Sequence, residues 1–175
     1  MVKSPSTQSP LSSASQAENR QHVGLTGEVL TSVLVYDPTV EQVDTLLQGL
    51  EAGVKAWPIV PGGRHPIECI SQAMSSNSLK TLHILGHGAP GEVILGGVRL
   101  DASAFESLAD ARPGAGRPAF QIAFWSCNTG LGEVGMNFVK TIANATGAHV
   151  FASSGLVGHQ DQGGNWELDV QAAPK

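Results

Sequence analysis

The stretch LKTLHILGHGAPGEVILGGVRL, residues 79–100, decides how this chain is organised. Its first seven residues form a short apolar run, which predicts a strand. The hexapeptide GHGAPG (86–91) has the G-x-G-x-x-G spacing of dinucleotide-binding loops, and such a loop needs a helix after it to receive a phosphate. The next residues, EVILGGVRL (92–100), are instead two apolar segments around Gly96-Gly97, which indicates a β-hairpin. The sequence therefore favours a strand followed by a hairpin over a nucleotide site.

Further apolar runs with the length and composition of strands lie on both sides of this stretch. The expected strands are 31–37, 53–63, 79–85, 119–125, 149–154 and 166–170. The run AFQIAFW (119–125) is almost entirely apolar, which is typical of a central strand that is covered on both faces.

Helical patterns fill most of the gaps between these strands. A capping box of Thr39 and Gln42 predicts one helix start, Pro66 a second and Asp101 a third. The last helix carries Val134 and Phe138, and Gly147 is its expected C-cap. This alternation predicts an α/β fold with a mainly parallel central sheet, right-handed crossovers and helices on both faces.

Composition and charge limit the possible functions. We expect a disordered arm at 1–28, rich in Ser, Gln and Pro, then a single domain at 29–171 and a tail at 172–175. The net charge of −5 argues against nucleic acid as a partner, and no apolar run is long enough for membrane insertion. The arm has no apolar core of a signal peptide, so we expect a cytoplasmic location or export through another signal.

The candidate functional residues follow the expected strands, because parallel sheets collect active groups at the carboxyl ends of their strands. These residues are Asp37, His87, Gly88, Ser126, Cys127, Asn128, Ser153 and Ser154. If the third and fourth strands are neighbours, His87 and Cys127 lie about 4.8 Å apart across the sheet. A histidine there can take the thiol proton, and the amides of Gly88 and Cys127 can hold an oxyanion. Asp37 either orients His87, lines a substrate pocket or begins a turn.

Two other interpretations apply to these side chains. His83 and His87 form H-x-x-x-H, but four residues of strand span about 13 Å, too far to share a zinc ion, so no metal or cofactor is expected. The alternative for Cys127 is an inert buried thiol, which is also the expected state of Cys69 on its amphipathic helix.

Three segments together resemble a known family: LHILGHGAPGEVILGGVRL (82–100), FQIAFWSCNTG (120–130) with the helix and strand after it, and GGNWELDV (163–170). They are similar to an uncharacterised bacterial domain that is common at the N-terminus of very large cadherin-like and RTX-type adhesins. That domain in turn resembles the caspase–hemoglobinase fold of cysteine peptidases. The resemblance implies a three-layer caspase-like fold, with the His-Gly motif at His87-Gly88 and the nucleophile at Cys127.

The resemblance leaves two functions open. One is a cysteine endopeptidase with a His87/Cys127 dyad that acts on a polypeptide, either its own chain or a partner protein. In that case Asp37, Ser126, Asn128 and Ser153 are the expected substrate-binding residues. The other is a non-catalytic interaction module that keeps the fold. Cleavage specificity, oligomeric state and whether the dyad is active are not determined by the sequence.

Overall fold

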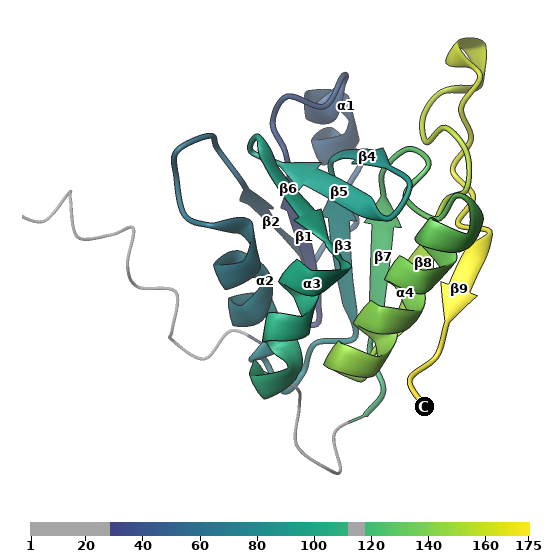
Figure 1. Ribbon diagram of the computed structural model, residues 1–175. Coiled ribbons are helices and arrows are strands. Elements are labelled where there is room, and N and C mark those ends of the chain that lie inside the picture. The colour runs from purple at the N-terminus through teal and green to yellow at the C-terminus, as the bar shows by residue number, and fades with distance from the viewer. Residues whose placement is uncertain (1–28, 112–117) are drawn as a thin grey trace, which may run out of the picture.

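The computed structural model describes residues 29–111 and 118–175 (Figure 1). The arm expected at 1–28 and most of the loop expected at 112–118 lie outside the described residues.

A six-stranded sheet forms the centre of the molecule, in the order β2-β1-β3-β7-β8-β9. All of its neighbouring pairs are parallel except the last, in which β9 runs antiparallel to β8. Its strands are β1 (Ser32–Tyr36), β2 (Val54–Pro58), β3 (Thr81–Leu85), β7 (Gln121–Trp125), β8 (His149–Ala152) and β9 (Val170–Ala172). The expected α/β architecture with a mainly parallel sheet is confirmed.

Helices connect the strands and cover the sheet unequally. They are α1 (Val43–Gln48), α2 (Pro66–Met74), α3 (Ala102–Glu106) and α4 (Gly132–Thr146), with 3-10 turns at Ser107–Ala111 and Gln160–Gln162. Figure 1 shows α2, α3 and α4 together on one face of the sheet, where the main core lies. On the other face, the short helix α1 packs over Leu34 and Leu85 in a small second cluster. Helices do occupy both faces, but one face is only partly covered.

Alternation along each strand explains the two clusters. In β1, Val33 and Val35 are fully buried in the main core, whereas Leu34 between them belongs to the cluster under α1. Successive side chains on a strand point to opposite faces, so both faces of β1 need apolar residues. The same pattern places Ile84 in the main core and Leu85 under α1.

A second, three-stranded antiparallel sheet follows β3, with β4 (His87–Ala89), β5 (Glu92–Leu95) and β6 (Val98–Asp101) in that order. The turn between β5 and β6 is Gly96-Gly97, with φ of 57° and 79°, so the expected hairpin is confirmed. Strand β5, and not a helix, follows the GHGAPG segment directly, as the hairpin predicts. Strand β4 itself was not expected from the sequence.

Several helix ends agree with the sequence, and one does not. Pro66 begins α2, Asp101 caps α3 by accepting a hydrogen bond from the Ala104 amide, and Gly147 ends α4 in the left-handed conformation. The predicted capping box of Thr39 is wrong: α1 begins at Val43, after Gln42. Thr39 does not cap the helix because its hydroxyl hydrogen-bonds to Asp37.

The last strand also differs from its expected position at 166–170. Strand β9 begins at Val170, and the residues before it leave the sheet. Trp166 packs its ring near that of Trp125, with centroids 6.1 Å apart. Asp169 accepts hydrogen bonds from the amide and hydroxyl of Ser154. These contacts hold the segment as an extended loop, so alternation alone placed the strand too early. Among the described residues, no helix has the length and apolar character needed to cross a bilayer.

Candidate functional site at the carboxyl edge of the sheet

The site begins where two neighbouring parallel strands end. Strands β3 and β7 are paired in the register Leu85 to Trp125, so the two chains leave the sheet side by side. His87 is the second residue after Leu85 at the end of β3, and Cys127 is the second residue after Trp125 at the end of β7. The prediction that these two strands are neighbours is therefore confirmed.

Gly88 brings these two segments into direct contact. A Cβ atom on Gly88 would lie 2.5 Å from the carbonyl oxygen of Cys127 and even closer to Oγ1 of Thr129. Both approaches are too short for any side chain, so only glycine permits them. The backbone of the His-Gly segment therefore packs directly on the loop that carries the thiol.

The imidazole of His87 is exposed, and one of its nitrogens is held. Its Nε2 lies 3.0 Å from the hydroxyl oxygen of Thr39. The Thr39 hydroxyl donates its own hydrogen to Asp37 Oδ1 at 2.7 Å, so it can only accept from the imidazole. This network assigns the proton to Nε2 and leaves Nδ1 as the basic nitrogen.

Asp37 anchors this arrangement from inside the protein, where it is only 2% exposed. Its Oδ1 also accepts from the Thr39 amide, and its Oδ2 accepts from the Gly96 amide in the hairpin turn, each at 2.8 Å. Burial alone would raise the pKa of Asp37, but these hydrogen bonds and the nearby His87 outweigh it and lower the pKa. The carboxylate is thus charged at neutral pH and ties β1, the hairpin turn and Thr39 together.

The thiol of Cys127 is half-buried and lies against the loop that follows β8. The Val157 amide donates to Sγ at 3.4 Å, and the Val157 carbonyl oxygen lies 3.7 Å from the same sulfur. The sulfur thus accepts from the Val157 amide, and the thiol can donate to the Val157 carbonyl oxygen, so both groups hold it in place. The backbone of this loop is therefore one wall of the site.

The loop that carries Cys127 is fixed by its own polar groups. Asn128 has a left-handed φ of 59°, and its amide donates to the Gly155 carbonyl at 2.8 Å. Ser126 is buried, and its hydroxyl lies 2.7 Å from that of Thr129. Ser153 is also buried and accepts from the Gly155 amide at 3.1 Å. The hydroxyls of both serines are therefore engaged inside the fold, and their contacts shape the two loops.

The other glycines near the site do not provide the open space around His87 that their small size suggests. A Cβ on Gly86 would meet the Ile94 carbonyl oxygen at 2.6 Å, and one on Gly130 would meet the Val170 side chain at 2.9 Å. Neighbouring atoms already fill this volume. These glycines serve close packing between backbone segments rather than clearance around His87.

Sequence reasoning missed Thr39 and Val157 as members of the site. The signal for Thr39 was present, since a hydroxyl two residues after an aspartate often bonds back to it, but it was assigned to a helix cap. No sequence signal marks Val157, because it contributes backbone atoms that any residue carries.

The remaining candidates lie outside this constellation. His83 accepts from the Trp125 indole through Nδ1 at 3.1 Å on the partly covered face of the sheet. Cys69 is buried on α2, and burial raises the pKa of its thiol, with the Glu68 carboxylate adding to the rise and Arg64 opposing it. Within the described residues, no three His, Cys, Asp or Glu side chains gather in a group that could hold a metal ion.

The fold and the site define an α/β protein with a histidine and a cysteine at adjoining strand ends. The chain belongs to the family described as domain of unknown function DUF4347, whose model matches residues 33–175. The match covers the six-stranded sheet except its first residue, Ser32, together with both loops of the site and the hairpin between them. A comparison with curated proteins finds no match.

Proposed function

We propose that this chain is a cysteine endopeptidase domain of the caspase-like type, with Cys127 as nucleophile and His87 as its acid and base. The observation that carries the proposal is the close approach of Gly88 to the Cys127 carbonyl oxygen, which a Cβ atom on Gly88 would meet at 2.5 Å. This contact packs the backbone of the His-Gly segment on the loop that carries the thiol, which supports the proposed dyad. The Thr39 hydroxyl, which donates to the Asp37 carboxylate, also contacts His87 Nε2 and so orients the imidazole.

The reaction follows from the groups at this edge. Cys127 Sγ attacks the carbonyl carbon of a peptide bond, and the carbonyl oxygen takes the negative charge. The amides of Gly88 and Cys127 are the proposed donors to that oxygen. His87 Nδ1 carries the thiol proton to the departing amine, which leaves an acyl-enzyme. Water then attacks the acyl group, its proton passes to His87, and the thiolate is released.

The architecture supports this assignment in two further ways. A mainly parallel sheet with its reactive groups at the carboxyl edge is the arrangement in which α/β enzymes place their sites. The order of His-Gly after β3 and cysteine after β7 also resembles the caspase–hemoglobinase peptidases. The proposed substrate is a polypeptide, either this chain itself or a protein that it accompanies, and the resemblance to adhesin-associated domains favours a partner of that kind.

Alkylation tests the proposed dyad without knowledge of the substrate. We expect a peptidyl chloromethyl ketone to modify Cys127 at least ~100-fold faster than Cys69, because an activated thiolate reacts and a buried thiol does not. Mass spectrometry of the two cysteine peptides measures both rates. His87→Ala removes the base and should reduce the Cys127 rate to that of an ordinary accessible thiol.

His149→Ala is the matched control, because His149 is an exposed histidine at the opposite end of the sheet, on the first residue of β8. This variant should label like the wild type. Equal and slow modification of both cysteines, or a Cys127 rate that does not respond to His87→Ala, would refute the dyad.

A non-catalytic interaction module is the second candidate, and one observation favours it. The Cys127 sulfur lies against both the amide and the carbonyl of Val157, which is an environment that a packed, inert thiol can also have. In that case Cys127→Ser and His87→Ala would leave partner binding unchanged, whereas substitutions of exposed loop residues such as Leu131 would weaken it.

A further inference from the structure

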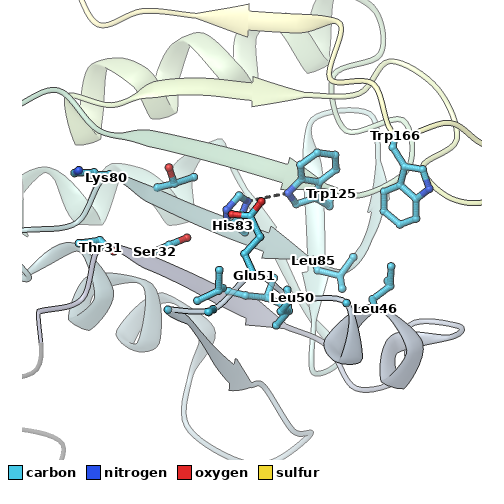
Figure 2. Close-up of a pocket in the computed structure, with 16 residues that line it drawn as sticks. Thr31, Ser32, Leu46, Leu50, Glu51, Lys80, His83, Leu85, Trp125 and Trp166 are labelled. Carbon is cyan, nitrogen blue, oxygen red and sulfur yellow. Dashed lines mark hydrogen bonds between the residues drawn. The ribbon is translucent and has the colours of Figure 1, made fainter.

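The partly covered face of the sheet contains a cavity that the proposed reaction does not use. It has a volume of about 620 Å³ and lies between helix α1 with the loop after it and the strands β1, β3 and β7. Figure 2 shows Lys80 and Thr31 at one end, and Trp125 and Trp166 at the other. This volume is in the range of pockets that hold small organic molecules.

The tryptophan end of the cavity is aromatic and apolar. The rings of Trp125 and Trp166 are 6.1 Å apart with an angle of 53° between their planes, so they form two walls of a corner. Leu46 and Leu50 from the α1 side complete the apolar lining (Figure 2). Trp166 is 47% exposed, so one large aromatic ring is available to a ligand at the cost of little protein rearrangement.

An acidic group reaches into the same region. The Glu51 side chain extends over the sheet toward His83 and Trp125 (Figure 2), and its carboxylate is close enough to influence the His83 charge. His83 does not supply a positive charge to pair with Glu51. Burial lowers the pKa of His83, and the nearby Glu51 carboxylate raises it by less than burial lowers it. The histidine is therefore neutral at pH 7, with Nδ1 accepting from Trp125.

Charge is thus distributed unevenly along the cavity. Lys80 is exposed at the far end, whereas the Glu51 carboxylate lies beside His83 and Trp125, next to the end that the two tryptophan rings form (Figure 2). A cation is stabilised over an aromatic face and by a nearby carboxylate, and it is repelled from a lysine. The cationic group of a ligand would therefore lie at the tryptophan end, with its apolar part on the leucines.

We propose that this cavity binds an organic amine with an apolar body, its ammonium group held between the Glu51 carboxylate and the rings of Trp125 and Trp166. The site goes beyond the proposed peptidase activity, because it uses none of His87, Thr39 or Cys127.

Three probes that share one apolar body separate the role of charge from that of shape. Calorimetric titration of the full chain with 4-phenylbutylamine should show one molecule bound per chain. The neutral 4-phenylbutanol should bind about fivefold more weakly, and the anionic 4-phenylbutyrate more weakly still. Glu51→Gln should lower the affinity for the amine about fivefold and leave that for the alcohol unchanged.

A second measurement locates the probe. The chain has three tryptophans, and their indole N–H signals in a nitrogen-15 NMR spectrum report on separate places. The amine should shift the signals of Trp125 and Trp166. The signal of Trp57, which packs toward the main core on the other face, should stay in place.

Glu41→Gln is the charge-matched control, because Glu41 is an exposed carboxylate before α1 that does not line the cavity. It should bind all three probes like the wild type. Equal affinity for the amine and the alcohol, no effect of Glu51→Gln, an equal loss with Glu41→Gln, or a shift of Trp57 alone would each overturn the proposal. Amine binding that stays unchanged in Cys127→Ser would separate this site from the dyad.

Discussion

At the scale of single residues, the decisive group is the hydroxyl of Thr39. It connects a buried carboxylate to an exposed imidazole, with Oγ1 2.7 Å from Asp37 Oδ1 and 3.0 Å from His87 Nε2. A hydroxyl in this position fixes both the ring orientation and the tautomer of the histidine. Thr39 therefore acts on the proposed chemistry through His87, as a positioning residue.

Replacing Thr39 tests this role. Thr39→Val keeps the shape of the side chain but removes the hydroxyl, so we expect the alkylation rate of Cys127 to fall about tenfold. Thr39→Ser restores the hydroxyl and should recover most of the rate. The pH profile of alkylation is a second readout, because a purely structural role of Thr39 would leave that profile unchanged. Equal rates for the valine and serine variants would show that the hydroxyl plays no part.

The Asp37 carboxylate makes a separate, pH-dependent contribution to stability. Its pKa is lowered below the unfolded value of 3.8, so the charged form stabilises the fold above that pH. This stabilisation is lost as the pH falls through the lower folded-state pKa. Asp37→Asn places an amide NH₂ against the donors of Gly96 or Thr39, so we expect a loss of about 2 kcal/mol at pH 7.

Urea unfolding between pH 2 and pH 7 measures this contribution. The wild-type free energy of unfolding should decrease below about pH 4, and the asparagine variant should show a flatter profile there. A variant whose profile runs parallel to the wild type would mean that Asp37 does not carry the pH dependence.

At the scale of elements, the β5–β6 hairpin supports the site from a distance. Its turn residue Gly96 donates to Asp37, and a Cβ on Gly96 would lie 2.9 Å from Ile59 Cγ2 and 3.1 Å from the Ile59 carbonyl oxygen. Its neighbour Gly97 also has a positive φ, but a Cβ there would meet nothing within 4 Å. A side chain at Gly97 would therefore meet backbone strain alone, whereas a side chain at Gly96 would meet the same strain and a steric clash with Ile59.

We expect Gly97→Ala to cost about 1 kcal/mol from the left-handed conformation alone. Gly96→Ala should cost at least ~1 kcal/mol more, because the turn must move away from Ile59. Thermal unfolding of both variants measures the difference. Gly96→Ala should also slow alkylation of Cys127, since a displaced turn loosens Asp37. Equal destabilisation by the two substitutions would contradict the close packing of this turn.

At the scale of the whole molecule, the sheet order predicts where the structure opens first. Strands β1, β3, β7 and β8 have neighbours on both sides, whereas β2 and β9 are the edges of the six-stranded sheet. Edge strands have one row of backbone groups that no sheet neighbour protects. Local opening should therefore begin at the edges and reach the centre last.

Hydrogen exchange checks this order directly. Amides of β3 and β7 should exchange at least ~100-fold more slowly than those of β2, whose side chains are mostly exposed or half-buried. Peptide-resolved mass spectrometry after native exchange supplies the rates. Protection of β2 equal to that of β7 would show that the strand order or the edge position of β2 is incorrect.

The prediction of the fold succeeded where local physics was sufficient. Apolar runs, hairpin glycines and helix caps such as Asp101 are local signals, and the structure confirms the strands and helices that they predict. The errors arose where a local signal had a long-range competitor. The sequence predicts that Thr39 caps a helix, but its hydroxyl hydrogen-bonds to Asp37 and His87 instead. It also predicts that Trp166 lies in a strand, but this side chain packs on Trp125.

The sequence by itself determined the alternation of elements, the parallel sheet and the set of residues at the ends of its strands, because hydrophobic period and turn chemistry act over a few residues. Tertiary structure decided how those residues meet. The contact of Gly88 with Cys127, the Asp37–Thr39–His87 hydrogen bonds and the cavity beneath α1 all join segments far apart in the chain. Such contacts depend on register, close packing and unequal coverage of the two sheet faces, which no local pattern records.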